Sequence, residues 1–125
     1  MSYNGFLKDG SEVYIPSWPV DAALENLASA GKYIGADNML RIAEINVPAV
    51  ILAITGSENP QKTTQLIKHF VCAARMDGQK ITQENVDMLF EGKLAKLAEL
   101  FSTVVHAQYY EFFVSGLVKE SSQEG

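Results

Sequence analysis

The chain opens with two short runs of β-prone residues, and apolar residues recur at helical spacing along most of its remaining length. Aromatic and aliphatic residues stand on both sides of the dipeptide Asp9-Gly10. Asp-Gly between two such runs is a strong signal for a tight hairpin turn. We therefore predict a small β-hairpin over residues 3–15, ended by Pro16 because proline has no N–H to donate to a strand ladder.

An amphipathic helix is predicted directly after the hairpin. Ser17 stands where it can cap the helix, so we expect the strand to give way to helix at Trp18. Gly31 is suited to end the helix, since glycine is common just past helix C-termini. The apolar stripe expected to face the core consists of Val20, Ala23, Leu24, Leu27 and Ala28.

Two shorter apolar segments come next. Asp37 can cap a second helix, which contains Met39, Leu40 and Ile42. The run Val47 to Ile54 suits a buried helix or a buried strand, because a short continuous apolar run does not distinguish the two. Asn46 and Pro48 form a suitable cap and first turn, so we favour the helix.

Further helices are predicted in the second half of the chain. Asn59-Pro60 opens one, and Asp77-Gly78 closes it. Thr82 begins another helical stretch, and after Gly92 a long helix runs from about Lys93 to Ser115. The core face of the helix that begins at Pro60 is expected to consist of Thr63, Leu66, Ile67, Phe70, Val71 and Ala74.

These elements together predict a mainly α fold. The small N-terminal β-hairpin leads into a compact bundle of about five helices with short connections. A chain of 125 residues fits one compact domain. We place this single domain at residues 1–118 and expect residues 119–125 to form a polar, flexible tail.

The last long helix carries the candidate functional surface. Its core face is expected to include Leu94, Leu97, Ala98, Phe101, Val104, Val105, Gln108 and Phe112, opposite a polar face of Lys96, Glu99, Thr103 and His106. Beyond Gln108 the helix becomes apolar nearly all round. Either the hairpin with Tyr14 and Trp18 folds over this end, or the end docks another chain. The candidate partner-binding residues are Phe101, Val105, Tyr109, Tyr110, Phe113 and Val114.

Charge and composition exclude several classes of protein. Ten basic and fifteen acidic residues give a net charge of −5, and no basic patch suits nucleic acid. The longest apolar block, Val47 to Ile54, is far shorter than the roughly 20 residues that cross a bilayer. The N-terminus lacks the pattern of a secretory signal, and a single cysteine forms no internal disulfide. We expect a cytoplasmic protein.

Catalytic and metal-binding residues are scarce. His69 and Cys72 stand three residues apart on a predicted helix, but a zinc site needs about four ligands. A nucleophilic pair of Cys72 and His106 would need a third residue to orient it, and the pattern supplies none. Cys72 fits better as a small hydrophobe at the edge of the core, and His69 as a partly exposed helix residue. We predict no catalytic residue, metal or cofactor.

Three segments of the chain resemble small tail assembly chaperones of tailed bacteriophages and prophages. They read GFLKDGSEV at residues 5–13, IPSWPVD at 15–21 and QYYEFF at 108–113, and the likeness extends over nearly the whole chain. The resemblance implies a short β element followed by a helical body. It further implies a protein that keeps the long, helical tape measure protein soluble until the tail tube polymerises around it. In that family a second, frameshift-extended form often recruits tube subunits.

Two hypotheses result. The first is a non-enzymatic chaperone that binds the tape measure protein through the last helix, with the tail tube protein or a second copy as further partners. The second is a structural tail completion or neck subunit that adds strands to its neighbours at the hairpin edge and self-assembles into a ring. The state of the purified protein, small oligomer or large assembly, distinguishes them.

Overall fold

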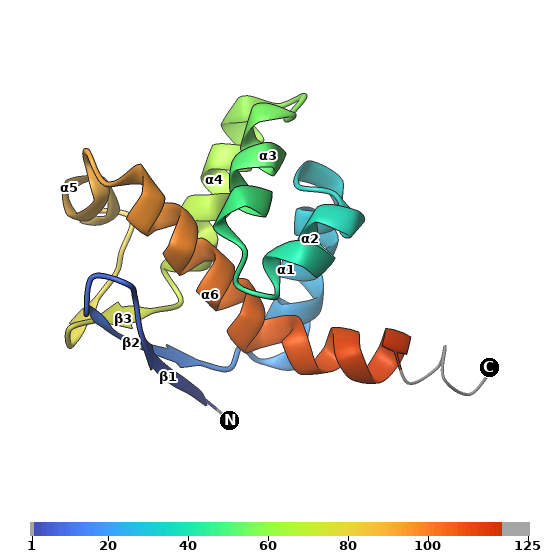
Figure 1. The fold of residues 1–125 in the computed structure, drawn as a ribbon, viewed down its shortest axis with the longest axis horizontal. Helices are drawn as coiled ribbons and strands as arrows, with labels where there is room; N and C mark the ends of the chain where they lie inside the picture. The colour runs from blue at the N-terminus through green and yellow to red at the C-terminus, as the bar shows by residue number, and fades with distance from the viewer. Residues whose placement is uncertain (1, 119–125) are drawn as a thin grey trace.

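The computed structural model describes residues 2–118, the last two by their backbone alone, and shows helices arranged around one long helix (Figure 1). In these residues the mainly α fold with an N-terminal hairpin is confirmed. The strands are β1 (Ser2–Phe6), β2 (Glu12–Pro16), β3 (Arg75–Met76) and β4 (Gln79–Lys80). The helices are α1 (Val20–Tyr33), α2 (Ala36–Ile42), α3 (Val47–Thr55), α4 (Pro60–Val71), α5 (Val86–Phe90) and α6 (Leu94–Phe113), which continues into a π-helical turn, η1 (Val114–Val118).

The strands form one antiparallel sheet in the order β1-β2-β3-β4, which contains more than the predicted hairpin. The prediction that Asp77-Gly78 closes a helix was wrong. α4 ends at Val71, and Asp77-Gly78 is the turn of a second hairpin, with φ of 52° and 81° at its two residues. Tight hairpin turns need this positive φ, and Asp-Gly is one of the pairs that adopt it most readily.

Two of the predicted helix starts are confirmed. The side chain of Asn46 accepts a hydrogen bond from the N–H of Ala49 at 3.1 Å, and the segment after it forms α3, a helix and not a strand. Asn59 caps α4 in the same way through the N–H of Lys62 at 3.2 Å. Each cap satisfies a backbone N–H that has no partner within its helix.

Other helix boundaries differ from the prediction. α1 begins at Val20 without a side-chain cap, and it continues through Gly31 to Tyr33 before Gly35 turns the chain with a φ of 100°. Asp37 lies in the first turn of α2, where a carboxylate favours the helix dipole, but it is not the cap. Thr82 and Asn85 bond each other in a turn, and α5 begins only at Val86.

α6 is the centre of the core. Six consecutive residues of α6, 100–105, are buried, which requires neighbours on every side of the helix. The rings of Phe70 and Phe101 lie 5.3 Å apart at the contact between α4 and α6. All six residues predicted for the core face of the helix that begins at Pro60 are buried, five of them in α4 and Ala74 just after it.

The predicted faces of α6 and α1 need correction. Thr103, which we expected on a polar face, is buried. Leu94 and Phe112, expected in the core, are exposed because they lie near the two ends of the helix. On α1 the packed side is rotated from the predicted stripe: Val20, Leu24 and Ala28 are exposed, while Ala30 is buried.

Candidate functional site

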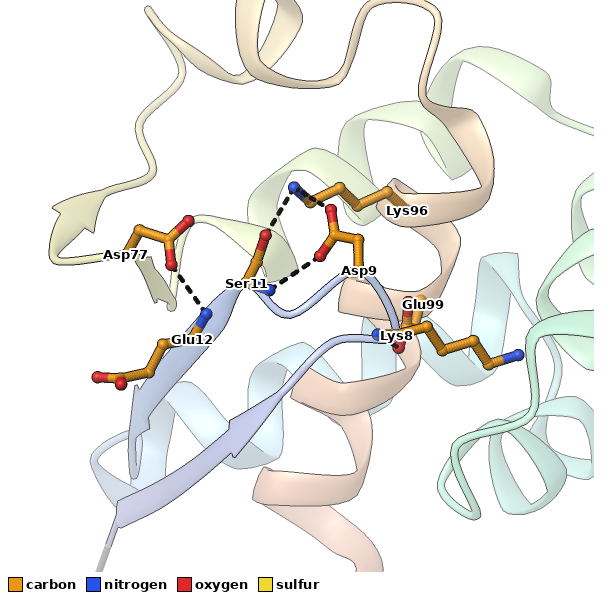
Figure 2. A network of polar contacts seen from close by, with 7 residues as sticks. All are labelled: Lys8, Asp9, Ser11, Glu12, Asp77, Lys96 and Glu99. Carbon is orange, nitrogen blue, oxygen red and sulfur yellow. Dashed lines mark hydrogen bonds and ion pairs between the residues drawn. The ribbon is translucent and has the colours of Figure 1, made fainter.

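The hairpin loop is fixed to α6 by a set of polar contacts (Figure 2). The Lys96 ammonium lies 2.8 Å from a carboxylate oxygen of Asp9 and donates to Ser11 Oγ at 2.8 Å. The N–H of Lys8 donates to Glu99 at 2.9 Å. The bond from Lys96, together with that from the Ser11 N–H, holds the pKa of Asp9 well below its usual range. Lys96 and Glu99, which belong to the predicted polar face of α6, therefore bind the hairpin loop.

Further contacts hold the base of the hairpin along α6. The ring of Tyr3 meets His106 edge-on at 5.8 Å, and His106 lies 2.8 Å from the carbonyl oxygen of Ala43 through Nδ1. Gln108 accepts from the N–H of Trp18 at 3.0 Å and donates to the carbonyl of Pro16 at 2.9 Å. The hairpin thus covers α6 from Lys96 to Gln108.

Trp18 and Tyr109 close the core where hairpin, α1 and α6 meet. Their ring centres are 6.2 Å apart, and Trp18 also contacts Phe70 edge-on at 5.0 Å. The hydroxyl of Tyr109 donates to the carbonyl of Ala23 at 2.7 Å. Burial raises the pKa of Tyr109, so the phenol stays neutral and keeps this bond.

The six predicted partner-binding residues fall into two groups. Phe101, Val105 and Tyr109 are buried and belong to the core. Tyr110 and Val114 are each 39% exposed, and Phe113 is half-buried with its ring stacked on Tyr109 at 5.9 Å. Trp18 therefore covers this end at Tyr109, while the last turns stay uncovered, and docking of another chain there remains a prediction. Tyr14 does not take part, because it lies on the exposed face of β2.

Apolar residues outside the predicted set are also exposed on α6 and α1. Phe112 is 57% exposed although it continues the stripe of Phe101 and Val105, because α6 projects past the other helices (Figure 1). Val20 and Leu24 of α1 are 72% and 55% exposed. The prediction that Phe112 lies in the core was wrong, because the pattern does not encode where the other helices end along α6. We call Tyr110, Phe112, Phe113 and Val114 the aromatic end of α6.

A second apolar surface lies on α3. This helix contains no charged residue, and Ile51, Leu52 and Ile54 are exposed on it. Beside it an apolar hollow of about 250 Å³ opens between α3, α4 and the start of α6. Its lining includes Val50, Ile54, Ile67, Leu94 and Leu97. Sequence reasoning missed this surface, although a run that is apolar on every side was its signal.

The histidines and the cysteine lie in different surroundings. His69 stacks on Trp18 at 6.4 Å and bonds Asn26, whereas His106 contacts Tyr3 and Ala43. Burial raises the pKa of the Cys72 thiol, which disfavours the reactive thiolate. Within residues 2–118, no group of three His, Cys, Asp or Glu side chains is placed to hold a metal ion. None of the helices described there has the length and apolar character to cross a membrane.

Uncovered apolar surfaces on the helices of a small domain are typical of the class of proteins that bind other proteins. Within that class, a family profile described as phage tail assembly chaperone protein, TAC, matches residues 9–120. The chain therefore belongs to the phage tail assembly chaperone family, and the resemblance of its sequence is confirmed. No curated protein and no solved structure matches it.

Proposed function

We propose that the protein is a non-enzymatic chaperone that binds the helical tape measure protein and keeps it soluble in the host cytoplasm during tail assembly. One observation supports this most directly: in a member of a tail assembly chaperone family, the last turns of α6 are apolar and uncovered. A chaperone for a long helical client needs apolar surface to cover the apolar stripe of that client. The net charge of −5 helps to keep the complex in solution.

The aromatic end is our candidate for the client-binding surface. Tyr110, Phe112 and Val114 offer exposed side chains, and Phe113 contributes the uncovered part of its ring. The binding surface is supported by buried residues that hold α6 in the core, namely Phe101, Val105 and Tyr109. We propose the tail tube protein as a further partner of the assembly.

Co-expression with the tape measure protein of the same phage tests this function. The wild-type protein is expected to raise the soluble fraction of the client, and Phe112→Ser is expected to remove most of that effect. Met88→Ser is the matched control, since Met88 is an exposed apolar residue on α5. A client that stays insoluble with the wild-type protein would refute the function. Loss with Leu94→Ser but not Phe112→Ser would assign binding to the hollow beside α3 instead.

A structural ring subunit is the second candidate function, and the exposed edge of β1 favours it. β1 pairs only with β2 among the described strands, so its other edge can accept a strand from a neighbour. Light scattering on the purified protein decides between the two functions. A small oligomer at all concentrations supports the chaperone, and growth into rings that Asn4→Pro prevents would support the structural subunit.

A further inference from the structure

The two stretches of chain that carry the aromatic end and the exposed apolar residues of α1 contain carboxylates but no basic residue other than histidine. Between Lys8 and Lys32, and again between Lys96 and Lys119, the sequence contains no lysine or arginine. The first of these stretches includes the exposed Asp21 and Glu25 of α1, and the second includes the exposed Glu111 of α6. The ion pairs formed within the described residues use Lys68 and Lys96, so none of these three carboxylates is neutralised by one.

The geometry of α1 places its exposed apolar residues on the side toward α6. Asn26 contacts α4 through His69, and Ala23 contacts α6 through Tyr109. Moving round the helix in that direction at 100° per residue, Leu27, Val20 and Leu24 come next. Asp21 and Glu25 lie beyond them on the solvent side. An apolar strip bordered by carboxylates therefore follows, round α1, the contact at Ala23 with Tyr109, the residue on which Phe113 of the aromatic end stacks.

We propose that this surface takes an amphipathic helix of another protein whose apolar stripe is flanked by lysine or arginine. This inference rests on the proposed function and specifies the chemistry of its client. Apolar side chains of the partner would cover Phe112 and Val114, and its basic residues would meet the carboxylates of Asp21, Glu25 and Glu111. Opposite charges around an apolar contact steer the encounter and select the partner.

The same charges argue against two other occupants. A second copy docked symmetrically would bring the same acidic border against itself, and like charges in contact are costly. An anionic membrane surface would be repelled for the same reason. A basic helical partner is the occupant that the charges favour.

Two designed helical peptides of about 20 residues test the proposal, with the same leucine stripe and flanks of either lysine or glutamate. Fluorescence anisotropy of the labelled peptides measures their affinity for the full chain. We expect the lysine peptide to bind roughly tenfold more tightly at low salt, with the difference shrinking as salt screens the charges.

Matched charge variants locate the effect. The triple variant Asp21→Asn, Glu25→Gln, Glu111→Gln is expected to remove most of the preference for lysine. The control Glu58→Gln, Glu84→Gln, Glu91→Gln changes the net charge equally at exposed sites elsewhere and should retain the preference. Equal affinity for the two peptides, or equal loss in the two triple variants, would overturn the proposal.

Phe112→Ser separates this inference from the proposed function. If Phe112→Ser weakens binding of both peptides but the wild-type protein does not prefer the lysine peptide, the aromatic end is the binding surface and the proposed preference for a basic partner is wrong. If Phe112→Ser changes neither peptide, the surface itself is wrong and the inference falls with it. The co-expression experiment then still decides the chaperone function by its own readout.

Discussion

Ser102 shows how much one side chain contributes at the centre of α6. It is fully buried, donates to the carbonyl of Ile42 at 2.6 Å and accepts from the N–H of Asn46 at 2.8 Å. These two bonds fix the turn between α2 and α3, in which Ile45 has a φ of 57°. A non-glycine residue rarely adopts this conformation, so the turn depends on such support.

We expect Ser102→Ala to lower the free energy of unfolding by about 2 kcal/mol, because the N–H of Asn46 would lose its partner in a half-buried position. Urea titration followed by circular dichroism measures the change. Ser29→Ala is the control: Ser29 is exposed on α1, and its replacement should stay within about 0.5 kcal/mol. Equal stability of Ser102→Ala and wild type would show that the two bonds add nothing net.

Asp9 gives a pH-dependent prediction. Because its pKa is lower in the folded chain than in the unfolded one, the folded state favours its charged form. The stabilisation is present above the unfolded pKa of about 4 and is lost as the pH falls toward the folded value. Asp9→Asn should therefore be less stable than wild type near neutral pH, and the difference should shrink in acid.

Urea midpoints at about pH 7 and about pH 3 measure this difference. The introduced amide keeps a side-chain oxygen for the Ser11 N–H, so Asp9→Asn removes mainly the charge that faces Lys96. We expect a small effect, because the carboxylate is half exposed and water screens such pairs. A difference that is unchanged between the two pH values would contradict the role of the charge.

At the scale of elements, the sequence predicted helix starts well where they depend only on neighbouring residues. The caps at Asn46 and Asn59 depend on residues within one turn, and α3 was predicted from its cap although its composition also suited a strand. The second hairpin was missed because β3 and β4 have two residues each, and β3 depends on pairing with β2, which lies far away in the sequence. Only the Asp77-Gly78 pair signalled it, and that signal also fits a helix end.

The cap of α4 leads to a prediction about this element. Asn59→Ala removes the acceptor for the Lys62 N–H and is expected to lower the free energy of unfolding by about 1 kcal/mol. Asn59→Gly should recover most of this loss, since glycine at a helix N-cap costs only a few tenths of a kcal/mol. Chemical denaturation of both variants tests it. An equal loss of stability in the alanine and glycine variants would mean that the Asn59 side chain does not stabilise α4 as a cap.

At the scale of the whole molecule, the sequence predicted part of the candidate site. Beyond Gln108 the sequence is apolar on nearly all sides of the helix, which indicated that this end is hard to cover completely. Tyr110 and Val114 are indeed exposed there. The pattern could not separate them from Phe101 and Val105, because burial depends on which elements lie alongside. The polar face of α6 shows the same limit: Lys96 and Glu99 face the hairpin loop, which lies about 90 residues away in sequence.

The single tryptophan allows a test of whether the hairpin and the helices unfold together as one domain. Trp18 contacts residues of α4 and α6 and directly precedes α1, so its fluorescence reports on the place where hairpin and helices meet. The buried residues of all these elements form one core cluster. We therefore expect one cooperative transition, in which tryptophan fluorescence and the helical circular dichroism signal change at the same urea concentration.

A second probe controls for the position of the first. In the double variant Trp18→Phe, Met88→Trp, the fluorescence comes from α5 instead. Its midpoint should again coincide with that of the circular dichroism, because α5 contributes Val86 and Phe90 to the same core. If Trp18 changed at lower urea than the dichroism while the tryptophan at position 88 did not, the hairpin would open before the helices. The aromatic end of α6 would then be the uncovered part of a larger surface that the hairpin normally hides.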